Sequence, residues 1–182
     1  MNGAQIVLIG GGARSGKSRF ALERARVLGA RRVFVATGQA FDEEMDARIA
    51  RHRAERGADF TTVEEPLALT RVLREEGRAE VVLVDCLTLW LSNLLLRGDD
   101  ETAIAATVDD LIQALGERRR HVVLVTNEVG LGIVPDNALA RTFRDVAGRA
   151  HQQLAAIADE VHVAILGTVL RLRPGPLEVV AP

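Results

Sequence analysis

Short apolar runs alternate along the chain with longer stretches in which apolar residues recur every three or four positions. The runs cover residues 6–9, 33–36, 81–84, 122–125 and 161–166, and the periodic stretches cover 17–28, 42–56, 67–76, 87–96, 101–118 and 137–158. Consecutive apolar positions are typical of strands that are covered on both faces, and their alternation with helices indicates βαβ crossovers. The pattern predicts an α/β fold, with a mainly parallel central sheet and helices on both of its faces. A break at Pro174-Gly175-Pro176 predicts that the tail forms an edge hairpin.

Composition supports one domain over residues 1–182, because 48% of the residues are apolar and no linker or repeat interrupts the pattern. Lys and Arg number 23 against 25 Asp and Glu, so the net charge of −2 gives no reason to expect a nucleic-acid or membrane partner. The single cysteine, Cys86, fits a reducing compartment, and we expect a cytoplasmic protein. The longest apolar region, 81–96, contains Asp85, Ser92 and Asn93 and does not resemble a membrane span.

A glycine-rich segment follows the first apolar run and precedes the first helical stretch. It fits the Walker A pattern of a P-loop, whose backbone N–H groups surround nucleotide phosphates. The nucleotide-binding candidates in it are Gly11, Gly12, Ala13, Arg14, Ser15, Gly16, Lys17 and Ser18. Lys17 would contact the outer phosphates, and the Ser18 hydroxyl would contact Mg²⁺. The alternative is a glycine-rich turn with an incidental lysine.

Polar residues also follow three other apolar runs, where an open parallel sheet collects its ligands. Asp85 ends VVLVD, a Walker B arrangement in which the carboxylate supports the metal, although it would also suit a helix N-cap. Glu128 follows the run at 122–125 and could orient a magnesium-bound water or, in a kinase, take the proton from an attacking hydroxyl as a base. A solvated loop glutamate is the other interpretation of Glu128.

His52 lies in the helical stretch 42–56, where it continues the apolar stripe of Met45 and Ile49. Arg48, Arg51, Arg53 and Arg56 surround it in the helix. Their positive charge should disfavour protonation of the imidazole and attract a triphosphate, as a nucleophile that attacks phosphorus requires. A packed, hydrogen-bonded histidine is the alternative. His121, His151 and His162 fall within predicted strands and a helix, where structural roles suffice.

Taken together, these motifs resemble one family, the bifunctional adenosylcobinamide kinase and adenosylcobinamide-phosphate guanylyltransferase of cobalamin biosynthesis. The resemblance rests on residues 11–22, 35–57, 81–95 and 126–161. It implies phosphorylation of adenosylcobinamide with ATP or GTP, followed by GMP transfer from GTP to adenosylcobinamide phosphate through a GMP-histidine intermediate, with His52 as the histidine. It also implies a RecA-like sheet, a homotrimer, and GTP contacts at the P-loop and at Thr37, Gly38, Gln39, Arg56, Glu64 and Asp85.

Two positions depart from the family pattern. His151 stands where an asparagine is expected, and Arg51 precedes His52 where some members have two histidines. Two other functions remain as alternatives: a P-loop kinase of a different small metabolite without a covalent intermediate, and a nucleotide-dependent switch. The chain lacks an Asn-Lys-x-Asp segment of the kind that selects guanine in signalling GTPases, which disfavours the switch.

Overall fold

The computed structural model describes residues 3–39, 57–75 and 77–181. Within these ranges, eight strands form one sheet in the order β3-β2-β4-β5-β1-β6-β7-β8. Their bounds are β1 (Ile6–Gly11), β2 (Arg32–Ala36), β3 (Phe60–Glu64), β4 (Val81–Asp85), β5 (His121–Val125), β6 (Glu160–Ile165), β7 (Thr168–Arg173) and β8 (Glu178–Ala181). The strands from β3 to β6 in this order pair in parallel, whereas β7 is antiparallel to β6 and β8. The predicted parallel sheet and C-terminal hairpin are confirmed.

Strand β3 was not predicted from the sequence. Its residues, FTTVE, include two threonines and a glutamate, and Phe60 is the buried one. The strand lies at the edge of the sheet, paired with β2 alone among the described strands. An edge strand that packs one large side chain carries neither the apolar run nor the regular alternation by which strands are recognised in sequence.

The helices begin and end close to the predicted positions. They are α1 (Lys17–Leu28), α3 (Leu69–Glu75), α4 (Leu87–Arg97), α5 (Glu101–Gly116) and α6 (Ala138–Ile157), with a short 3-10 helix, η1, at Gly57–Asp59. Side chains cap two of them, because Asp100 accepts from the N–H of Ala103 and Asn137 from that of Ala140. The predicted helix at 42–56 lies outside the described residues.

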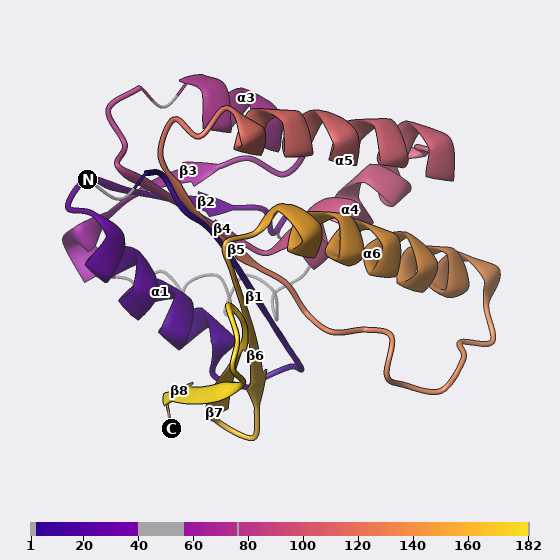
Figure 1. Ribbon diagram of the computed structural model, residues 1–182. Coiled ribbons are helices and arrows are strands. Elements are labelled where there is room, and N and C mark those ends of the chain that lie inside the picture. The colour runs from indigo at the N-terminus through magenta and orange to yellow at the C-terminus, as the bar shows by residue number, and fades with distance from the viewer. Residues whose placement is uncertain (1–2, 40–56, 76, 182) are drawn as a thin grey trace.

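Apolar residues on alternate positions of β1, β2, β4 and β5 belong to two separate cores. Helix α1 covers one face of the sheet, and α3, α4, α5 and α6 cover the other (Figure 1). In β1, Ile6 and Leu8 join the core under α3, α4, α5 and α6, whereas Val7 and Ile9 join the core under α1. Successive side chains of a strand point to opposite faces, so an uninterrupted apolar run fills both cores. This three-layer arrangement confirms the prediction of helices on both faces.

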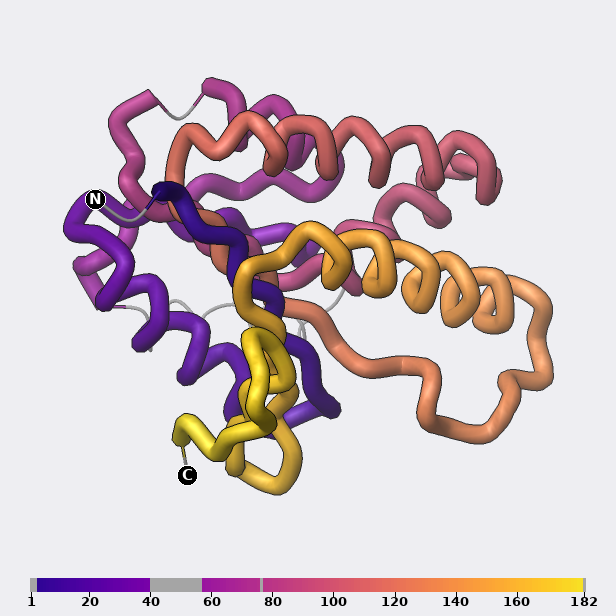
Figure 2. Tube along the Cα trace, in the orientation of Figure 1, coloured from indigo at the N-terminus to yellow at the C-terminus, as the bar shows by residue number. Residues whose placement is uncertain are grey.

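The turn between β6 and β7 returns the chain to the start of α1 (Figure 2). A side chain on Gly16 would lie 3.9 Å from the Cα of Gly167 in that turn. The last strands therefore lie against the segment that joins β1 to α1, and they help to define its surroundings.

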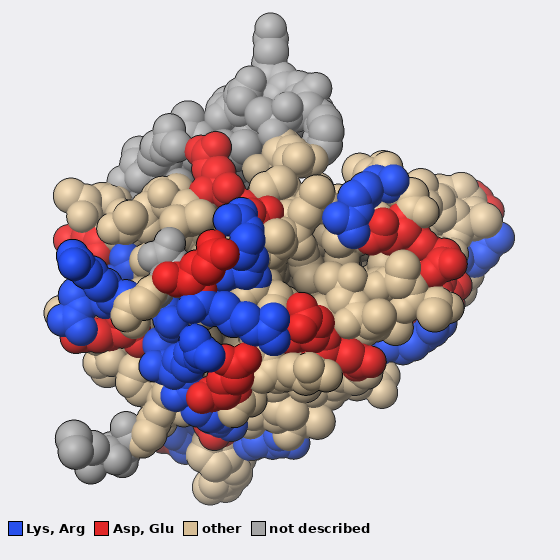
Figure 3. All heavy atoms as spheres, turned by 90° about the horizontal axis from the view of Figure 1, so that it is seen from above, with Lys and Arg blue, Asp and Glu red and all other residues tan. Residues whose placement is uncertain are grey.

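The upper face of the molecule carries mixed charge. Figure 3 shows basic and acidic side chains interspersed on this face, which is the top of the molecule in Figure 1. Arg74 of α3 contacts two carboxylates of the α5 region, Asp110 at 3.3 Å and Glu117 at 3.2 Å. Such exposed ion pairs contribute little stability, about 0–1 kcal/mol each.

Among the described residues, no helix has the length and apolarity needed to cross a bilayer.

Candidate active site

The segment between β1 and α1 curls back on itself. The Lys17 ammonium donates to the carbonyl oxygen of Gly12 over 3.0 Å, and the Ser15 N–H points to the same oxygen over 3.3 Å. Arg14 (φ 56°) and Gly16 (φ 93°) adopt left-handed backbone conformations. Consecutive turns of this kind direct backbone N–H groups into one concave space, as anion-binding loops require.

Gly11 permits close contact between this loop and β6. A Cβ at Gly11 would lie 2.5 Å from the carbonyl oxygen of Ala164 and 2.8 Å from the Ser15 hydroxyl. Cβ atoms in proteins essentially never make contacts this short, so the backbone at Ala164 or the loop itself would have to shift. The first glycine of the predicted P-loop is therefore a packing requirement as well as a motif residue.

The loop has the electrostatic character of a phosphate site. Lys17 and Ser15 are each only 7% exposed, and helix α1 begins at Lys17 with the positive end of its dipole at the loop. The Ser15 hydroxyl is buried and makes no hydrogen bond within the described residues. Since a buried polar group without a partner is costly, a bound oxyanion would satisfy it. The residues present thus fit a nucleotide phosphate.

Asp85 is the last residue of β4. It lies at the carboxyl ends of the parallel strands, as the loop after β1 does, and β5 lies between β4 and β1. It does not cap the following helix, because Cys86 occupies the N-cap of α4. The N-cap alternative for Asp85 is therefore wrong. Burial raises the pKa of the Cys86 thiol, the Asp85 charge raises it further, and the Lys17 charge lowers it.

Thr37 connects the ends of β2 and β4. Its buried hydroxyl donates to the Cys86 carbonyl and accepts from the Cys86 N–H, each over 2.8 Å. Asn93 of α4 donates to the Thr37 carbonyl over 2.8 Å and to that of Pro66 over 3.1 Å. The Thr37 side chain is thereby engaged in positioning the strand end that carries Asp85.

Glu128 lies beside the phosphate loop. Its N–H donates to the carbonyl oxygen of Gly11 over 3.0 Å, and its side chain accepts from the N–H of Gly130 over 2.5 Å. His151 reaches the same region from α6 and hydrogen-bonds through Nε2 to the Thr126 hydroxyl over 2.5 Å. Burial lowers the pKa of His151, and the charge of Glu128 partly opposes that shift. Burial thus favours the neutral form of the His151 imidazole.

The other predicted residues either lie at the carboxyl ends of β2 and β3 or fall outside the described residues. Gly38 and Gln39 follow Thr37, with Gln39 exposed, and Glu64 ends β3 opposite Ala36 of β2. His52 and Arg56 fall outside the described residues, so their placement in the site stays a prediction.

The sequence analysis did not predict a polar cluster next to the carboxyl ends of β4 and β5. Asn127 donates to the Thr88 hydroxyl over 3.0 Å, and Thr88 lies 3.0 Å from the Cys86 sulfur. The cluster joins the ends of β4 and β5 to the first turn of α4. The polar triplet 126–128 after an apolar strand marked this region, but the contact to Thr88 depends on strand order, which the sequence pattern does not specify.

The fold and loop define a P-loop nucleotide-binding protein with a RecA-like sheet. The RadB recombinase aligns with a TM-score of 0.53 and 15% identity, covering 97% of this chain and 86% of that one. An ATPase from a type III secretion system aligns with a TM-score of 0.55 and 15% identity, covering 90% of this chain and 51% of that one. At this identity the likeness establishes the fold alone.

Sequence relatives identify the group within that class. The profile described as "Cobinamide kinase / cobinamide phosphate guanyltransferase" matches residues 7–172, so the chain belongs to this family. The bifunctional adenosylcobalamin biosynthesis protein CobP of Pseudomonas aeruginosa is 47% identical over 171 residues, covering 93% of this chain and 98% of that protein. CobU of Escherichia coli, of the same descriptive name, is 42% identical, covering 92% and 99%.

Proposed function

We propose that this chain catalyses two successive reactions of cobalamin biosynthesis in the cytoplasm. It phosphorylates the hydroxyl of adenosylcobinamide with ATP or GTP, and it then transfers GMP from GTP to adenosylcobinamide phosphate, giving adenosylcobinamide-GDP. One observation carries the proposal: the phosphate loop, Asp85 and Glu128 all lie at the carboxyl ends of the parallel strands. They do so in a chain whose match to the family covers residues 7–172.

In the kinase step, the chain supplies positioning, charge and a base. The loop N–H groups and Lys17 hold the phosphates and offset the negative charge that develops on them. Glu128 takes the proton from the substrate hydroxyl as its oxygen bonds to the γ-phosphorus. The bond from that phosphorus to the bridging oxygen breaks, and the nucleoside diphosphate leaves.

Ser18 and Asp85 are the residues that would hold Mg²⁺. Hydroxyl and carboxylate oxygens suit this ion, which keeps several waters and binds through one or two protein groups together with phosphates. In the described part of the chain, no group of three or more His, Cys, Asp or Glu could hold a metal ion. Ser18 and Asp85 would hold the ion together with the nucleotide phosphates, and its chemistry would be neutralisation of phosphate charge.

The guanylyl transfer proceeds in two displacements at phosphorus. An imidazole nitrogen of His52 bonds to the α-phosphorus of GTP, and pyrophosphate leaves with the electron pair of the broken P–O bond. A phosphate oxygen of adenosylcobinamide phosphate then attacks the same phosphorus and releases the histidine. Arg56 and Glu64 are further GTP contacts in this proposal, together with Thr37, Gly38 and Gln39.

A homotrimer is part of the proposal. Large apolar side chains are exposed after β5 and at the start of α6, among them Leu131 (91%), Ile133 (96%) and Leu139 (55%). Leu139 also lines an apolar pocket of about 210 Å³ between α4 and α6. Contiguous exposed apolar surface is typical of subunit contacts, and sedimentation equilibrium of the purified protein would measure the mass of the assembly.

The decisive experiment follows label from GTP into the protein. Incubation with GTP labelled at the α-phosphate should give protein-bound label that acid removes and alkali spares, as a phosphoramidate behaves. His52→Ala should abolish this label while some kinase activity remains, and GTP labelled at the γ-phosphate should leave none on the protein. Absence of α-label on the unaltered protein would favour the plain kinase or the switch, and equal loss of both activities in His52→Ala would make His52 structural.

A further inference from the structure

The turn between β6 and β7 is formed by Leu166 and Gly167, and it lies beside the phosphate loop (Figure 2). A Cβ on Gly16 would lie 3.9 Å from the Cα of Gly167. In the first turn of α1, the Phe20 ring packs against the His162 ring of β6, with 5.1 Å between the ring centroids. The turn is therefore held next to the loop and next to the start of α1.

This turn has leucine at a position that suits asparagine. It joins the paired residues Ile165 and Thr168 through two residues that both have positive φ, 52° at Leu166 and 83° at Gly167. Hairpin turns of this kind favour Asn-Gly or Asp-Gly, because a short polar side chain tolerates the left-handed conformation and can hydrogen-bond locally. A branched apolar side chain is strained in that conformation.

Solvent exposure makes leucine unfavourable here a second time. Leu166 is 97% exposed, and its neighbour Ile165 is 52% exposed. A single exposed apolar side chain is common on protein surfaces, but this one also occupies a strained backbone position beside a phosphate loop. Local rules are broken in this way mainly at functional sites, where a ligand compensates for the cost. The turn thus has the character of a surface that a bound molecule covers.

The positions of the reacting groups indicate how a nucleotide lies in the loop during the proposed kinase step. On one side of β1 are β5 and β4, which are followed by Glu128 and ended by Asp85, and on the other side is β6. The γ-phosphate has to face Glu128 and Asp85 for the substrate hydroxyl to attack it. The nucleoside then leaves the loop on the opposite side, toward β6 and the turn that follows it.

The GTP contacts considered so far outside the loop do not serve a nucleoside on that side. Thr37 follows β2 and Glu64 ends β3, and both strands lie beyond β5 and β4 in the sheet. These residues can contact the nucleoside of the GTP used in guanylyl transfer. The base of the nucleotide used in the kinase step needs a contact on the other side of the loop.

We propose that the β6–β7 turn binds the purine base of the nucleotide that phosphorylates adenosylcobinamide, with the Leu166 side chain packed on the face of the base. The proposal rests on the proposed function, because the kinase step fixes the direction of the nucleotide. Every base has a flat π-face that an apolar side chain can cover, and covering it removes apolar surface of both partners from water. Such a contact does not read the edge of the base, so it accepts both ATP and GTP.

Calorimetric titration with ATP, GTP and inorganic tripolyphosphate tests this contact. The His52→Ala chain is used without adenosylcobinamide, so neither proposed reaction proceeds. Leu166→Asn should weaken ATP binding about five- to tenfold, the effect of losing partial burial of a leucine side chain, and should leave tripolyphosphate binding unchanged. Leu166→Met, which keeps an apolar side chain, should retain most of the ATP affinity. Leu177→Asn is the matched control, because Leu177 is a 66% exposed leucine that precedes β8 and lies outside the β6–β7 turn.

Urea unfolding of the same variants separates binding from a structural role. Asparagine suits both the turn and the solvent, so Leu166→Asn should unfold at a urea concentration no lower than that of the parent chain. A loss of affinity confined to the purine nucleotides, without a loss of stability, supports the proposal.

Three results would overturn the proposal. These are unchanged ATP affinity in Leu166→Asn, equal weakening of ATP and tripolyphosphate, and purine triphosphates that bind the parent chain no more tightly than tripolyphosphate. Failure of the proposed function is distinguishable from all three, because it would appear as absence of GMP label on the unaltered protein, whereas these measurements follow binding without turnover.

Discussion

The backbone N–H of Glu128 donates to the carbonyl oxygen of Gly11 over 3.0 Å. This hydrogen bond continues the β1–β5 pairing beyond the end of β5, as does the bond that the Thr126 N–H donates to the Ile9 carbonyl over 2.9 Å. The loop after β5 is thus held against the first residue of the phosphate loop. Residues 117 positions apart in the chain are thereby neighbours at the candidate active site.

Replacing Glu128 with glutamine should slow the kinase step while leaving nucleotide binding intact. An amide cannot accept the hydroxyl proton, and loss of a general base lowers kcat by about 10²–10⁴-fold. Steady-state phosphorylation of adenosylcobinamide would measure the rate, and equilibrium titration with GTP would measure the affinity. Glu178→Gln is the control, because Glu178 is an exposed residue of β8 that is not among the candidate site residues. A Glu128→Gln enzyme with a normal kcat would exclude Glu128 as the base.

Gly11→Ala should reduce both stability and nucleotide affinity. The added methyl group would meet the Ala164 carbonyl at 2.5 Å, so β6 and the phosphate loop must separate. Overpacking of this kind costs typically about 1–3 kcal/mol. Urea unfolding would measure the stability loss, with Gly12→Ala as the control because a Cβ there meets nothing within 4 Å. Equal stability of the two variants would contradict this account of Gly11.

Lys17→Met should abolish both proposed activities without unfolding the chain. Methionine retains the length of the buried side chain but loses the ammonium group, which is worth about 1.5–3 kcal/mol when it hydrogen-bonds to charged phosphate. GTP affinity should therefore fall by roughly 10–100-fold. Equilibrium binding and thermal unfolding would separate the two effects. A variant that binds GTP normally would show that Lys17 does not contact phosphate.

His151→Asn should change how stability depends on pH. Burial holds the pKa of His151 below its ordinary value of 6.5, so on acidification the unfolded chain takes up this proton before the folded one does. The wild type should therefore lose stability as the pH falls below about 6.5, whereas the asparagine variant should not lose this contribution. Urea unfolding at about pH 7.5 and pH 5 would measure the difference between the two proteins. A difference that does not vary with pH would show that His151 titrates alike in both states.

Glu160→Gln should flatten the acid limb of the stability profile. A hydrogen bond with His162 lowers the pKa of Glu160 from 4.5 to about 2; burial opposes this shift, and Arg24 adds to it. The carboxylate then stabilises the folded state above about pH 4.5, and this contribution is lost as the pH falls toward 2. Its size is on the order of 3 kcal/mol. Unfolding followed from pH 6 downward in both proteins, at about half-unit steps, would reveal a wild-type loss that the variant lacks.

The features predicted well from the sequence are those that leave a local pattern. The apolar runs became β1, β2, β4, β5 and β6, and the glycine segment before Lys17 became the loop between β1 and α1. Each depends on residues close together in the chain, either through burial on both faces or through backbone turns that glycine favours. The position of Asp85 was also predictable, because the last residue of a parallel strand lies at the carboxyl end of the sheet.

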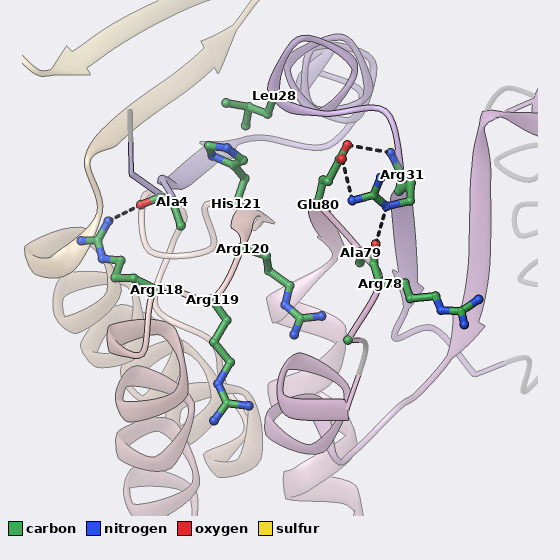
Figure 4. Close-up of a pocket in the computed structure, with 11 residues that line it drawn as sticks. Ala4, Leu28, Arg31, Arg78, Ala79, Glu80, Arg118, Arg119, Arg120 and His121 are labelled. Carbon is green, nitrogen blue, oxygen red and sulfur yellow. Dashed lines mark hydrogen bonds and ion pairs between the residues drawn. The ribbon is translucent and has the colours of Figure 1, made fainter. Parts of the chain in front are cut away.

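Features that depend on spatial neighbours were less accessible. Strand β3 is recognisable only once β2 is available to pair with it, and the Thr37–Cys86 hydrogen bonds require β2 and β4 to be adjacent. His151 lies in the middle of a long helix, and its contact with Thr126 depends on the packing of α6 against the sheet. An arginine-rich pocket at the amino ends of the central strands (Figure 4) is lined by residues that are dispersed from Ala4 to His121, so no local pattern marks it.

The placement of β1 between β5 and β6 has a consequence for biosynthesis. Its neighbours are residues 121–125 and 160–165, so β1 leaves the ribosome well before either of its partners has been made. Contacts of such long sequence separation form slowly, because a large loop must close before they are gained. The surroundings of the phosphate loop are therefore incomplete until β5 and β6 have been synthesised, and products truncated before β6 should lack catalytic competence even when the residues of the loop are present.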